Sequence, residues 1–589
     1  MRDNKVPERK RKRVEEEEKG TDALPRRSTR QRAVHDYSQL NDPPIEIAQI
    51  IRNEEEDVPF SFDKAVYTAL VNSSVATDDP KTLEEAMASP EWPEWENAIQ
   101  TELDQLRVMG TWSLVNAPKN RKPVANKWVF IKKFNKDGQL MKYKARLVAK
   151  GFSQIPGMDF NQTFAPVVRF ETIRTILAEA VQRRWKLRQM DVKGAYLNGY
   201  LKEEVYMDQP YGFGDGTSKV CRLVKTLYGL KQSGREWNEE LNRKLTKKGF
   251  RRLISDPCAY RREENGHVEI LTVWVDDLML FTNDDAAMTH LIADLREMFE
   301  ITDLGEPGKI VGIEITINKE TGEVKLTQTK YIEALLTKYG LENANGVAVP
   351  MDPNIKFEKP ETSSDPQDRS NTYASLIGSL MFIAVATRPD IVFAVFRLAS
   401  YTANPDLHHW SAAKRILRYL SSTRYQGIVY RPGTEAEMVG YSDASFASFE
   451  DMTSVTGYVF KAAGGAITWA SKKQKSVSLS TTEAEYACMA DAAREAVWLQ
   501  NLHDELGFGK KGPTLIHGDN QGALAIANNP QYHKRTKHFD IKHHYIREKV
   551  NDRSIKIEYC PTEDMTADIF TKPLPKPKYQ KHKAELGIA

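Results

Sequence analysis

The sequence predicts a multidomain α/β and α+β chain that carries two separate sets of acidic side chains. Its 589 residues are enough for about three or four domains. Residues 270–281 are apolar except around Asp276 and Asp277, which predicts a β-hairpin with two carboxylates at its tip. From about residue 439 a second set of acids appears on predicted strands and helices. The chain is therefore expected to contain two catalytic units.

Composition excludes several classes of protein. The formal net charge is only +3, so the total charge does not by itself indicate nucleic-acid binding. The four cysteines, Cys221, Cys258, Cys488 and Cys560, are far apart in sequence, which argues against a disulfide framework and a zinc finger and favours a reducing, intracellular setting. No apolar run is long enough to span a bilayer, and the first residues are charged, so we expect no membrane anchor or signal peptide.

The first 79 residues are rich in charge and poor in aromatics, which predicts a disordered segment. Residues 9–13 form a basic cluster that is followed by glutamates at 15–18. This cluster has two interpretations, a solvated tail or a nuclear-localisation or nucleic-acid contact.

Order is expected to begin near Thr82, which has capping-box spacing to Glu85. An apolar pattern of three- and four-residue spacing then predicts a helix that Gly110 ends. Strands are expected at residues 128–133 and 143–148. The basic residues beside these strands are Lys132, Lys133, Lys144, Arg146 and Lys150.

Residues 223–262 carry the densest positive charge of the region expected to fold, on a helix with an apolar face. Either this face is merely solvated or it follows a phosphate backbone, and the sequence leaves both interpretations open. Residues 350–368 are predicted to be an internal linker, because they are rich in proline and charge.

The paired aspartates suggest a metal site. Two ionised carboxylates on a buried hairpin are costly unless a cation or hydrogen bonds compensate for their desolvation, and clustered oxygen ligands suit Mg²⁺ or Mn²⁺. The alternative is an exposed Asp-Asp turn. Asp191, at the end of a short predicted strand, adds a third acid and favours the metal site.

Five ordered blocks resemble the reverse transcriptase of copia-like long-terminal-repeat retrotransposons. They are residues 144–152, 164–168, 189–199, 227–233 and 275–277. This resemblance implies a right-hand polymerase of fingers, palm and thumb/connection, followed by an RNase H-like mixed-sheet domain. The implied boundaries are 80–325 for fingers and palm, 326–435 for thumb/connection and 436–589 for the RNase H-like domain.

The resemblance also implies the residues of a polymerase site. Asp191, Asp276 and Asp277 would hold two Mg²⁺ or Mn²⁺ ions for in-line phosphoryl transfer. The nucleotide would contact Lys144, Arg146, Tyr196, Tyr228 and Gly229. Tyr196 would exclude ribonucleotides by closing the space beside C2′ of the sugar, unless it is simply a core aromatic.

The second set of acids resembles that of RNase H, again with two ions. Its expected ligands are Asp443, Glu485, Asp519 and Asp568, with a hairpin over residues 455–473 that turns at Gly464. Glu483 has capping-box spacing to Ser480, so Glu485 is the preferred ligand. Many RNases H carry a histidine in the loop before the last acid, and residues 559–564 contain none.

The expected function is therefore RNA-directed DNA synthesis with degradation of RNA in RNA/DNA hybrids. The implied partners are RNA template, DNA primer, hybrid and dNTPs, with capsid and integrase of a parent element as further candidates. The implied location is a cytoplasmic virus-like particle, with nuclear access left open. The chain is expected to be the C-terminal part of a polyprotein.

An alternative is a decayed or domesticated nucleic-acid-binding remnant without catalysis. Trp274, Gly194 and Gly234 depart from the family pattern, but none of these positions is an expected metal ligand. Survival of all seven acids favours the enzyme.

Overall fold

The computed structural model describes residues 79–134, 139–355, 357, 367–434, 437–509, 512–528 and 540–589. All of them belong to one compact unit. The predicted disordered segment lies outside the described residues except for Asp79, as do the basic cluster at 9–13 and residues 358–366 of the predicted linker. In the described part of the chain, no helix is both long and apolar enough to cross a membrane. All four cysteines are buried and form no disulfide.

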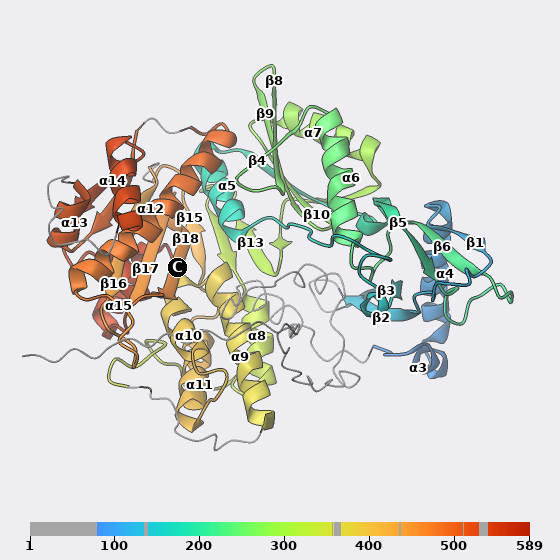
Figure 1. The fold of residues 1–589 in the computed structure, drawn as a ribbon, viewed down its shortest axis with the longest axis horizontal. Coiled ribbons are helices and arrows are strands. Elements are labelled where there is room, and N and C mark those ends of the chain that lie inside the picture. Colours follow the sequence, from blue (N-terminus) through green and yellow to red (C-terminus); the bar gives the residue numbers. More distant parts are fainter. Residues whose placement is uncertain are drawn as a thin grey trace, which may run out of the picture. The chain divides into compact units, whose positions relative to one another are not determined.

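The N-terminal part of the described chain pairs two helices with a two-stranded ribbon (Figure 1). Its elements are α3 (Leu83–Ala88), α4 (Trp92–Val108), β1 (Trp112–Val115), β2 (Asn126–Phe134) and β3 (Leu140–Ala149). Gly110 follows α4 with a φ of +63°, as expected for a helix end. The Thr82 hydroxyl accepts the N–H of Glu85, whereas the Glu85 carboxylate accepts the N–H of Lys81, so half of the predicted capping box forms.

The β2–β3 ribbon has two chemically different faces. Residues directly opposite in an antiparallel pair share a face, and successive residues alternate between faces. The pairs Trp128–Leu147 and Phe130–Ala145 are buried in the apolar cluster that contains α4. The opposite face therefore carries the side chains of Lys133, Lys142, Lys144 and Arg146.

The central sheet is antiparallel, in the order β11-β4-β10-β9-β8-β7. Its strands are β4 (Lys186–Val192), β7 (Arg251–Arg252), β8 (Ala259–Glu264), β9 (His267–Trp274), β10 (Asp277–Thr282) and β11 (Ile301–Gly305). The predicted hairpin at residues 270–281 is confirmed, since β9 and β10 pair directly. The helices of this part are α5 (Phe170–Arg183), α6 (Ser233–Lys247) and α7 (Asp285–Met298).

A second sheet and a helical layer follow. The sheet has the order β12-β13-β14-β15, and its strands are β12 (Lys309–Ile310), β13 (Ile313–Ile317), β14 (Val324–Thr327) and β15 (Ile428–Tyr430). Four helices follow β14 and precede β15 in the sequence: α8 (Thr329–Lys338), α9 (Gln367–Ala386), α10 (Val392–Ala399) and α11 (Leu407–Ser422). They pack against one another (Figure 1). The expected boundary at 325/326 lies inside β14, which pairs with β15 from the far end of this segment.

The C-terminal part contains a mixed sheet in the order β18-β17-β16-β19-β20. Its strands are β16 (Val439–Ser445), β17 (Val455–Ala462), β18 (Gly465–Lys473), β19 (Thr514–Gly518) and β20 (Ile555–Tyr559). The first three are antiparallel, whereas β16, β19 and β20 are parallel. The predicted hairpin at residues 455–473 is confirmed. Helix α12 (Thr481–Glu505) packs on β16 and β17 (Figure 1).

The remaining elements are two strands, three helices and four short 3₁₀ turns of the described chain. They are β5 (Tyr200–Met207) and β6 (Val220–Lys225), which form a sheet with β1, and α13 (Gln521–Asn528), α14 (Asp540–Asn551) and α15 (Lys576–Glu585). Short 3₁₀ turns occur at η1 (Gly151–Ser153), η2 (Ala195–Asn198), η3 (Pro389–Ile391) and η4 (Thr566–Phe570).

Arg174 of α5 joins three parts of the chain. Its guanidinium is fully buried and donates to the carbonyl oxygens of Val385 and Ala386 at 2.8 and 3.0 Å, and of Ile467 at 2.7 Å. It also lies 4.0 Å from the ring centre of Trp469. One side chain therefore satisfies carbonyl groups of both α9 and β18 from the central-sheet helix.

We expect Arg174→Met to weaken this junction. The substitution leaves three buried carbonyls without their donor, which should lower the free energy of unfolding by about 2–4 kcal/mol. Arg183→Met on the same helix is the control, because its side chain is 42% exposed and pairs with Glu179; it should cost under about 1 kcal/mol. Urea unfolding followed by tryptophan fluorescence measures both, and equal effects would contradict the role of Arg174.

Candidate active sites

The central hairpin places two of the expected acids opposite each other. Asp277 begins β10 and pairs in register with Asp191 near the end of β4, while Asp276 lies in the turn. Val275 adopts a φ of +55°, which is unfavourable for a β-branched residue. The turn is fixed because the Trp237 indole donates to the Val275 carbonyl at 2.7 Å. The N–H of Val192 also donates to the Asp276 carbonyl, at 2.9 Å.

These acids repel one another in a partly buried setting. Burial, followed by the charge of Asp276, raises the pKa of Asp277 to about 7, although a hydrogen bond from Gln189 opposes the shift. Burial and Asp276 also raise the pKa of Asp191, while Lys144 and Arg146 lower it. A cation at this position would relieve both effects.

The basic face of the β2–β3 ribbon lies toward these acids. Lys144 and Arg146, both expected nucleotide contacts, are close enough to lower the pKa of Asp191. Lys133 belongs to the same group and was missed as a site residue. Its pKa is lowered, because desolvation outweighs the attraction of Asp276 and Asp191. Strand alternation would have found it, since Lys133, opposite Lys142, shares the face of Arg146.

Arg146, Tyr228 and Tyr196 of the expected nucleotide site contact one another in series. The guanidinium of Arg146 lies 4.3 Å from the ring centre of Tyr228, and Tyr228 meets Tyr196 edge to face at 5.4 Å. Both tyrosines are buried, and burial raises the pKa of Tyr228 to about 12. These contacts therefore connect the basic ribbon to the turn that follows β4.

Gly229 is required for backbone packing. Its φ is +93°, and a Cβ at this position would lie 2.1 Å from the carbonyl oxygen of Ala149. Only glycine allows this approach, which sets the end of β3 against the Tyr228 loop. This backbone contact explains the glycine without invoking a nucleotide.

The three departures from the family pattern fit their surroundings. Trp274 stacks on Phe170 with ring centres 6.1 Å apart. Gly194 has a φ of +58°, and a Cβ at Gly234 would lie 2.9 Å from the Cβ of Ala165. None of the three disturbs the pairing of β4 with β10.

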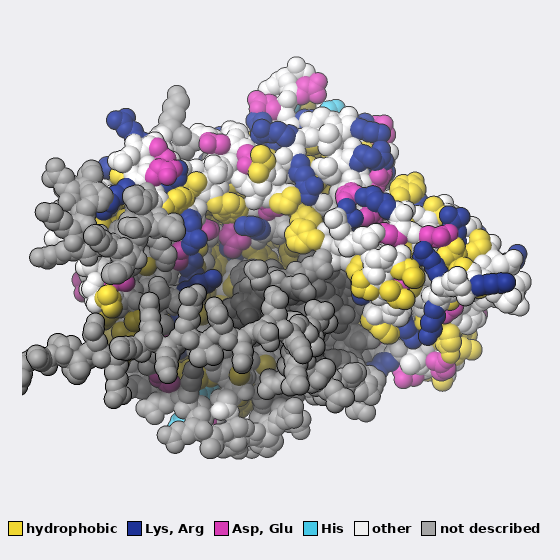
Figure 2. Space-filling view, viewed as in Figure 1, with side chains coloured by type: hydrophobic (Ala, Val, Ile, Leu, Met, Phe, Trp, Pro, Cys, Tyr) yellow, Lys and Arg dark blue, Asp and Glu magenta, His cyan; other side chains and the backbone are white. Residues whose placement is uncertain are grey.

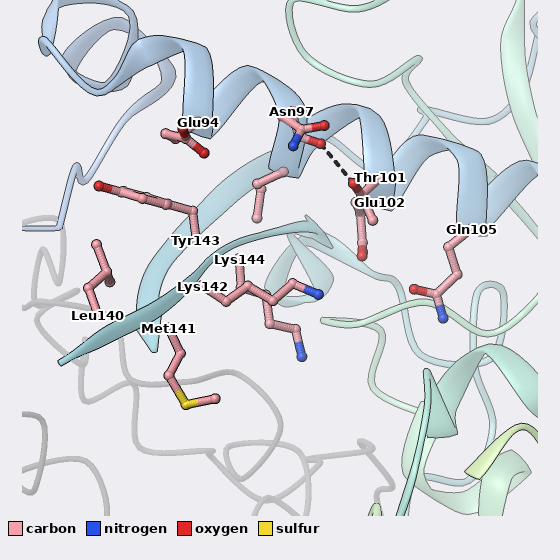
Figure 3. Close-up of a pocket in the computed structure, with 12 residues that line it drawn as sticks. Glu94, Asn97, Thr101, Glu102, Gln105, Leu140, Met141, Lys142, Tyr143 and Lys144 are labelled. Atoms are coloured by element: carbon pink, nitrogen blue, oxygen red, sulfur yellow. Dashed lines mark hydrogen bonds between the residues drawn. The ribbon is translucent and has the colours of Figure 1, made fainter. Parts of the chain in front are cut away.

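A pocket of about 390 Å³ lies between α4 and β3 (Figure 3). Lys142 and Lys144 extend from its edge in the same direction, and Glu102 points between the helix and the strand (Figure 3). Glu102 is buried and accepts the N–H of Leu147 at 3.4 Å. Burial raises its pKa to about 7, against the opposing effects of that hydrogen bond and of Lys144.

The C-terminal sheet brings three of the second set of acids together. Oxygen atoms of Asp443, Glu485 and Asp519 lie within 4.8 Å of one another. No other described residues form such a three-acid group, and the acids of the central sheet do not form one either. Asp443 lies on β16, Glu485 on α12, and Asp519 directly after β19. Burial raises the pKa of Asp443 to about 7 and that of Glu485 well above its usual value.

The choice between the two glutamates of α12 follows from their hydrogen bonds. Glu485 is buried, and its carboxylate accepts the N–H of Ala444 on β16 at 3.1 Å. Glu483 is at the start of the helix, where its carboxylate accepts the N–H of Leu479 at 2.6 Å. The structure therefore places Glu485 in the cluster and Glu483 at the helix cap.

Asp568, the fourth expected ligand, is held by lysines. It lies on η4, fully buried, and its two oxygens are each 2.7 Å from an ammonium group, Lys572 and Lys578 respectively. Sequence reasoning did not identify these lysines. In the loop before it, which contains no histidine, the Thr562 hydroxyl donates to Asp519 at 2.8 Å.

Both sets of donors have the chemistry of a divalent-ion site, but among the described residues only the second set brings three acids within 4.8 Å of one another. All of them are carboxylate oxygens, which suit Mg²⁺ or Mn²⁺. Burial raises the pKa values of Asp277, Asp443 and Glu485, and a bound cation would oppose this shift. Asp191 and Asp276 would complete the first set, and Asp519 the second.

The basic residues around α6 are largely paired with acids. Arg243 contacts Glu240 at 2.6 Å, and Lys248 contacts Asp294 at 3.0 Å. Figure 2 shows Lys and Arg interspersed with Asp and Glu on the visible face. Of the two interpretations of this segment, the ion pairs favour a solvated face.

The two acid sites and their sheets define a class of protein, a polymerase-type palm followed by an RNase H-like domain. Residues 109–353 match the family described as reverse transcriptase (RNA-dependent DNA polymerase). The chain is 39% identical over 519 residues to the Retrovirus-related Pol polyprotein from transposon TNT 1-94 of Nicotiana tabacum, covering 87% of this chain and 39% of the relative. It is 37% identical over 522 residues to that from transposon RE2 of Arabidopsis thaliana, covering 88% and 35%.

A shorter relative is matched over its full length. The chain is 32% identical over 312 residues to a putative transposon Ty5-1 protein of Saccharomyces cerevisiae, covering 52% of this chain and 100% of the relative. The chain belongs to the copia-type retrotransposon Pol polyproteins and contains their reverse transcriptase domain. It spans about two fifths of the length of the plant polyproteins.

Among solved structures, the prototype foamy virus protease-reverse transcriptase is similar at 14% identity and a TM-score of 0.22, covering 82% of this chain and 55% of that one.

Glu102 should make the stability of the folded chain depend on pH. Its folded pKa of about 7 exceeds the ordinary value of 4.5, so the folded chain binds more protons between these values and stability falls as the pH rises through that window. Glu102→Gln should remove this loss and stabilise the chain at pH 8 by roughly 1–3 kcal/mol. Thermal unfolding from pH 5 to 8 measures it. Glu94→Gln, on an exposed side chain of the same pocket, should leave the pH dependence unchanged.

Proposed function

We propose that the chain is an RNA-directed DNA polymerase that extends a DNA primer on an RNA template. The observation that carries the proposal is the register of Asp191 against Asp277, with Asp276 in the adjoining turn, opposite the basic face of the ribbon. Bound Mg²⁺ or Mn²⁺, two ions per site by family resemblance, would lower the pKa of the primer hydroxyl and stabilise charge on the leaving pyrophosphate.

The chain's own residues supply the remaining parts of the site. Lys133, Lys144 and Arg146 provide positive charge for the triphosphate. Tyr228 and Gly229 fix the wall beside the nascent base pair, and Tyr196 limits the space at C2′ of the sugar. These assignments rest on the family resemblance, on the face shared by the basic residues and on the contact between Tyr196 and Tyr228.

The C-terminal domain is proposed to be a ribonuclease H that cleaves the RNA strand of a hybrid. Support comes from the mixed sheet order and from the cluster of Asp443, Glu485 and Asp519. Asp568 was expected to be the fourth metal ligand. Lys572 and Lys578, each 2.7 Å from one of its oxygens, would compete with a metal ion for this carboxylate. Recognition of the hybrid would rest on backbone shape and 2′-hydroxyl groups.

The proposed setting is the replication of a retrotransposon. The substrates would be RNA template, DNA primer, hybrid and dNTPs, with capsid and integrase of a parent element as further partners. The proposed location is a virus-like particle in the cytoplasm, with access to the nucleus as a second proposal. The second candidate is a remnant without catalysis, and the following test separates the two.

We expect Asp276→Asn to abolish DNA synthesis while leaving hybrid cleavage intact. The change removes an anion beside Asp277, which should slow primer extension at least about a hundredfold. Asp443→Asn should abolish hybrid cleavage while leaving DNA synthesis intact. Extension of a labelled DNA primer on RNA, and cleavage of a labelled RNA/DNA hybrid, both in Mg²⁺ or Mn²⁺, give the two readouts.

Each outcome of this test is interpretable. Loss of one activity per variant supports two independent sites. If the folded native chain binds template and primer but neither extends nor cleaves in either metal, the enzyme proposal fails and the remnant interpretation replaces it.

Tyr196→Val should relax discrimination against ribonucleotides. A smaller side chain opens space at C2′, so the ratio of dNTP to rNTP incorporation should fall by about ten- to a hundredfold. Tyr196→Phe retains the ring and should keep the discrimination. Single-nucleotide incorporation kinetics measure both, and an unchanged ratio for Tyr196→Val would reduce Tyr196 to a core aromatic.

A further inference from the structure

The acids of the RNase H-like domain differ in what surrounds them. Asp443, Glu485 and Asp519 face one another, with oxygen atoms within 4.8 Å. Asp568 instead has an ammonium group at 2.7 Å from each of its oxygens. The domain therefore contains one position suited to a divalent ion and a second position already supplied with positive charge.

Lys572 occupies the space between two of the acids. Its ammonium lies 2.7 Å from Oδ1 of Asp568 and 3.8 Å from Oδ2 of Asp443. Asp568 is fully buried and Asp443 is 2% exposed, whereas the side chain of Lys572 is 38% exposed, so its ammonium reaches two buried acids from a partly exposed position. The Thr571 hydroxyl donates to the same Oδ2 of Asp443. Lys578, in contrast, contacts Asp568 and not Asp443 among its ion pairs.

We propose that this domain binds one divalent ion, in the cluster of Asp443, Glu485 and Asp519, and that the ammonium of Lys572 occupies the second cation position, between Asp443 and Asp568. The proposal rests on the ribonuclease H function. It departs from the two ions that family resemblance implied for this site.

The charge balance supports one ion. Four carboxylates and two ammonium groups leave two negative charges, which a single divalent ion neutralises. A second divalent ion beside Asp568 would have to displace Lys572 and would be repelled by Lys578. Lys572 is thus a positioning residue that holds Asp443 and Asp568 together and provides a fixed positive charge beside the cluster.

The test counts Mn²⁺ ions in the full chain carrying Asp276→Asn and Asp277→Asn, which weaken ion binding at the palm. Electron paramagnetic resonance of free Mn²⁺ gives the bound number, and the difference from the same chain with Asp443→Asn counts ions in the second site. We expect one ion with Lys572 present and two with Lys572→Met. Lys578→Met is the matched control and should leave one ion, because Lys578 does not reach Asp443.

Two ions bound with Lys572 in place would overturn the proposal, as would the same count for the Lys572 and Lys578 variants. If Lys572→Met does not fold, anomalous scattering from crystals of the native-lysine chain soaked in Mn²⁺ answers the question directly. One peak at the cluster supports the proposal, and a second peak between Asp443 and Asp568 refutes it.

This result is separable from the function on which it rests. Cleavage of a labelled RNA/DNA hybrid by the chain carrying Asp276→Asn and Asp277→Asn is measured in the same samples. If one Mn²⁺ ion binds but the hybrid is not cleaved, the ribonuclease function is refuted and the proposed ion count is supported. If the hybrid is cleaved and two ions bind, only the proposed role of Lys572 is refuted.

Discussion

The burial of carboxylates, together with their mutual repulsion, is the constraint on which this structure depends. Each acid site gathers anions in a setting that raises their pKa values, Asp277 and Asp443 both to about 7. The protein opposes this cost with rigid β-ladders that fix the acids and with lysine or arginine side chains placed nearby. In the palm the compensating cations lie on the separate β2–β3 ribbon, whereas in the second site Lys572 and Lys578 belong to the same domain as the acids.

This difference has consequences for how each site can work. Lys144 and Arg146 act on the palm acids from another element of the chain. A substrate that enters between the ribbon and the hairpin would therefore replace the acids as the partner of these two cations. In the second site, Lys572 pairs with Asp568 four residues before it; the carboxylate is fully buried, and the lysine side chain is 38% exposed. The positive charge therefore comes from the same segment of the chain as the acid that it neutralises.

Buried polar contacts add to the shared apolar core that joins the central sheet, the helical layer and the C-terminal sheet. Arg174 donates to carbonyls of α9 and β18, and Trp469, on which it stacks, donates to Ala384 at 3.2 Å. The end of the chain returns to the same region, because Gly427 and Ala589 exchange backbone hydrogen bonds at 3.0 and 3.1 Å. Such contacts link residues that are between 85 and 293 positions apart in the sequence.

Sequence alone determined the local elements and the residue types of both sites. Alternation and apolar runs gave the hairpin at residues 270–281, and the spacing of Ser480 to Glu483 separated the helix cap from Glu485, because these signals act over a few residues. Tertiary structure decided what lies across space: the face that groups Lys133 with Arg146, the lysines on Asp568, and the pairing of β14 with β15. Nothing in the sequence near Asp568 distinguishes a metal ligand from the partner of an ammonium group, since that depends on which buried charges the folded chain brings within a few ångströms.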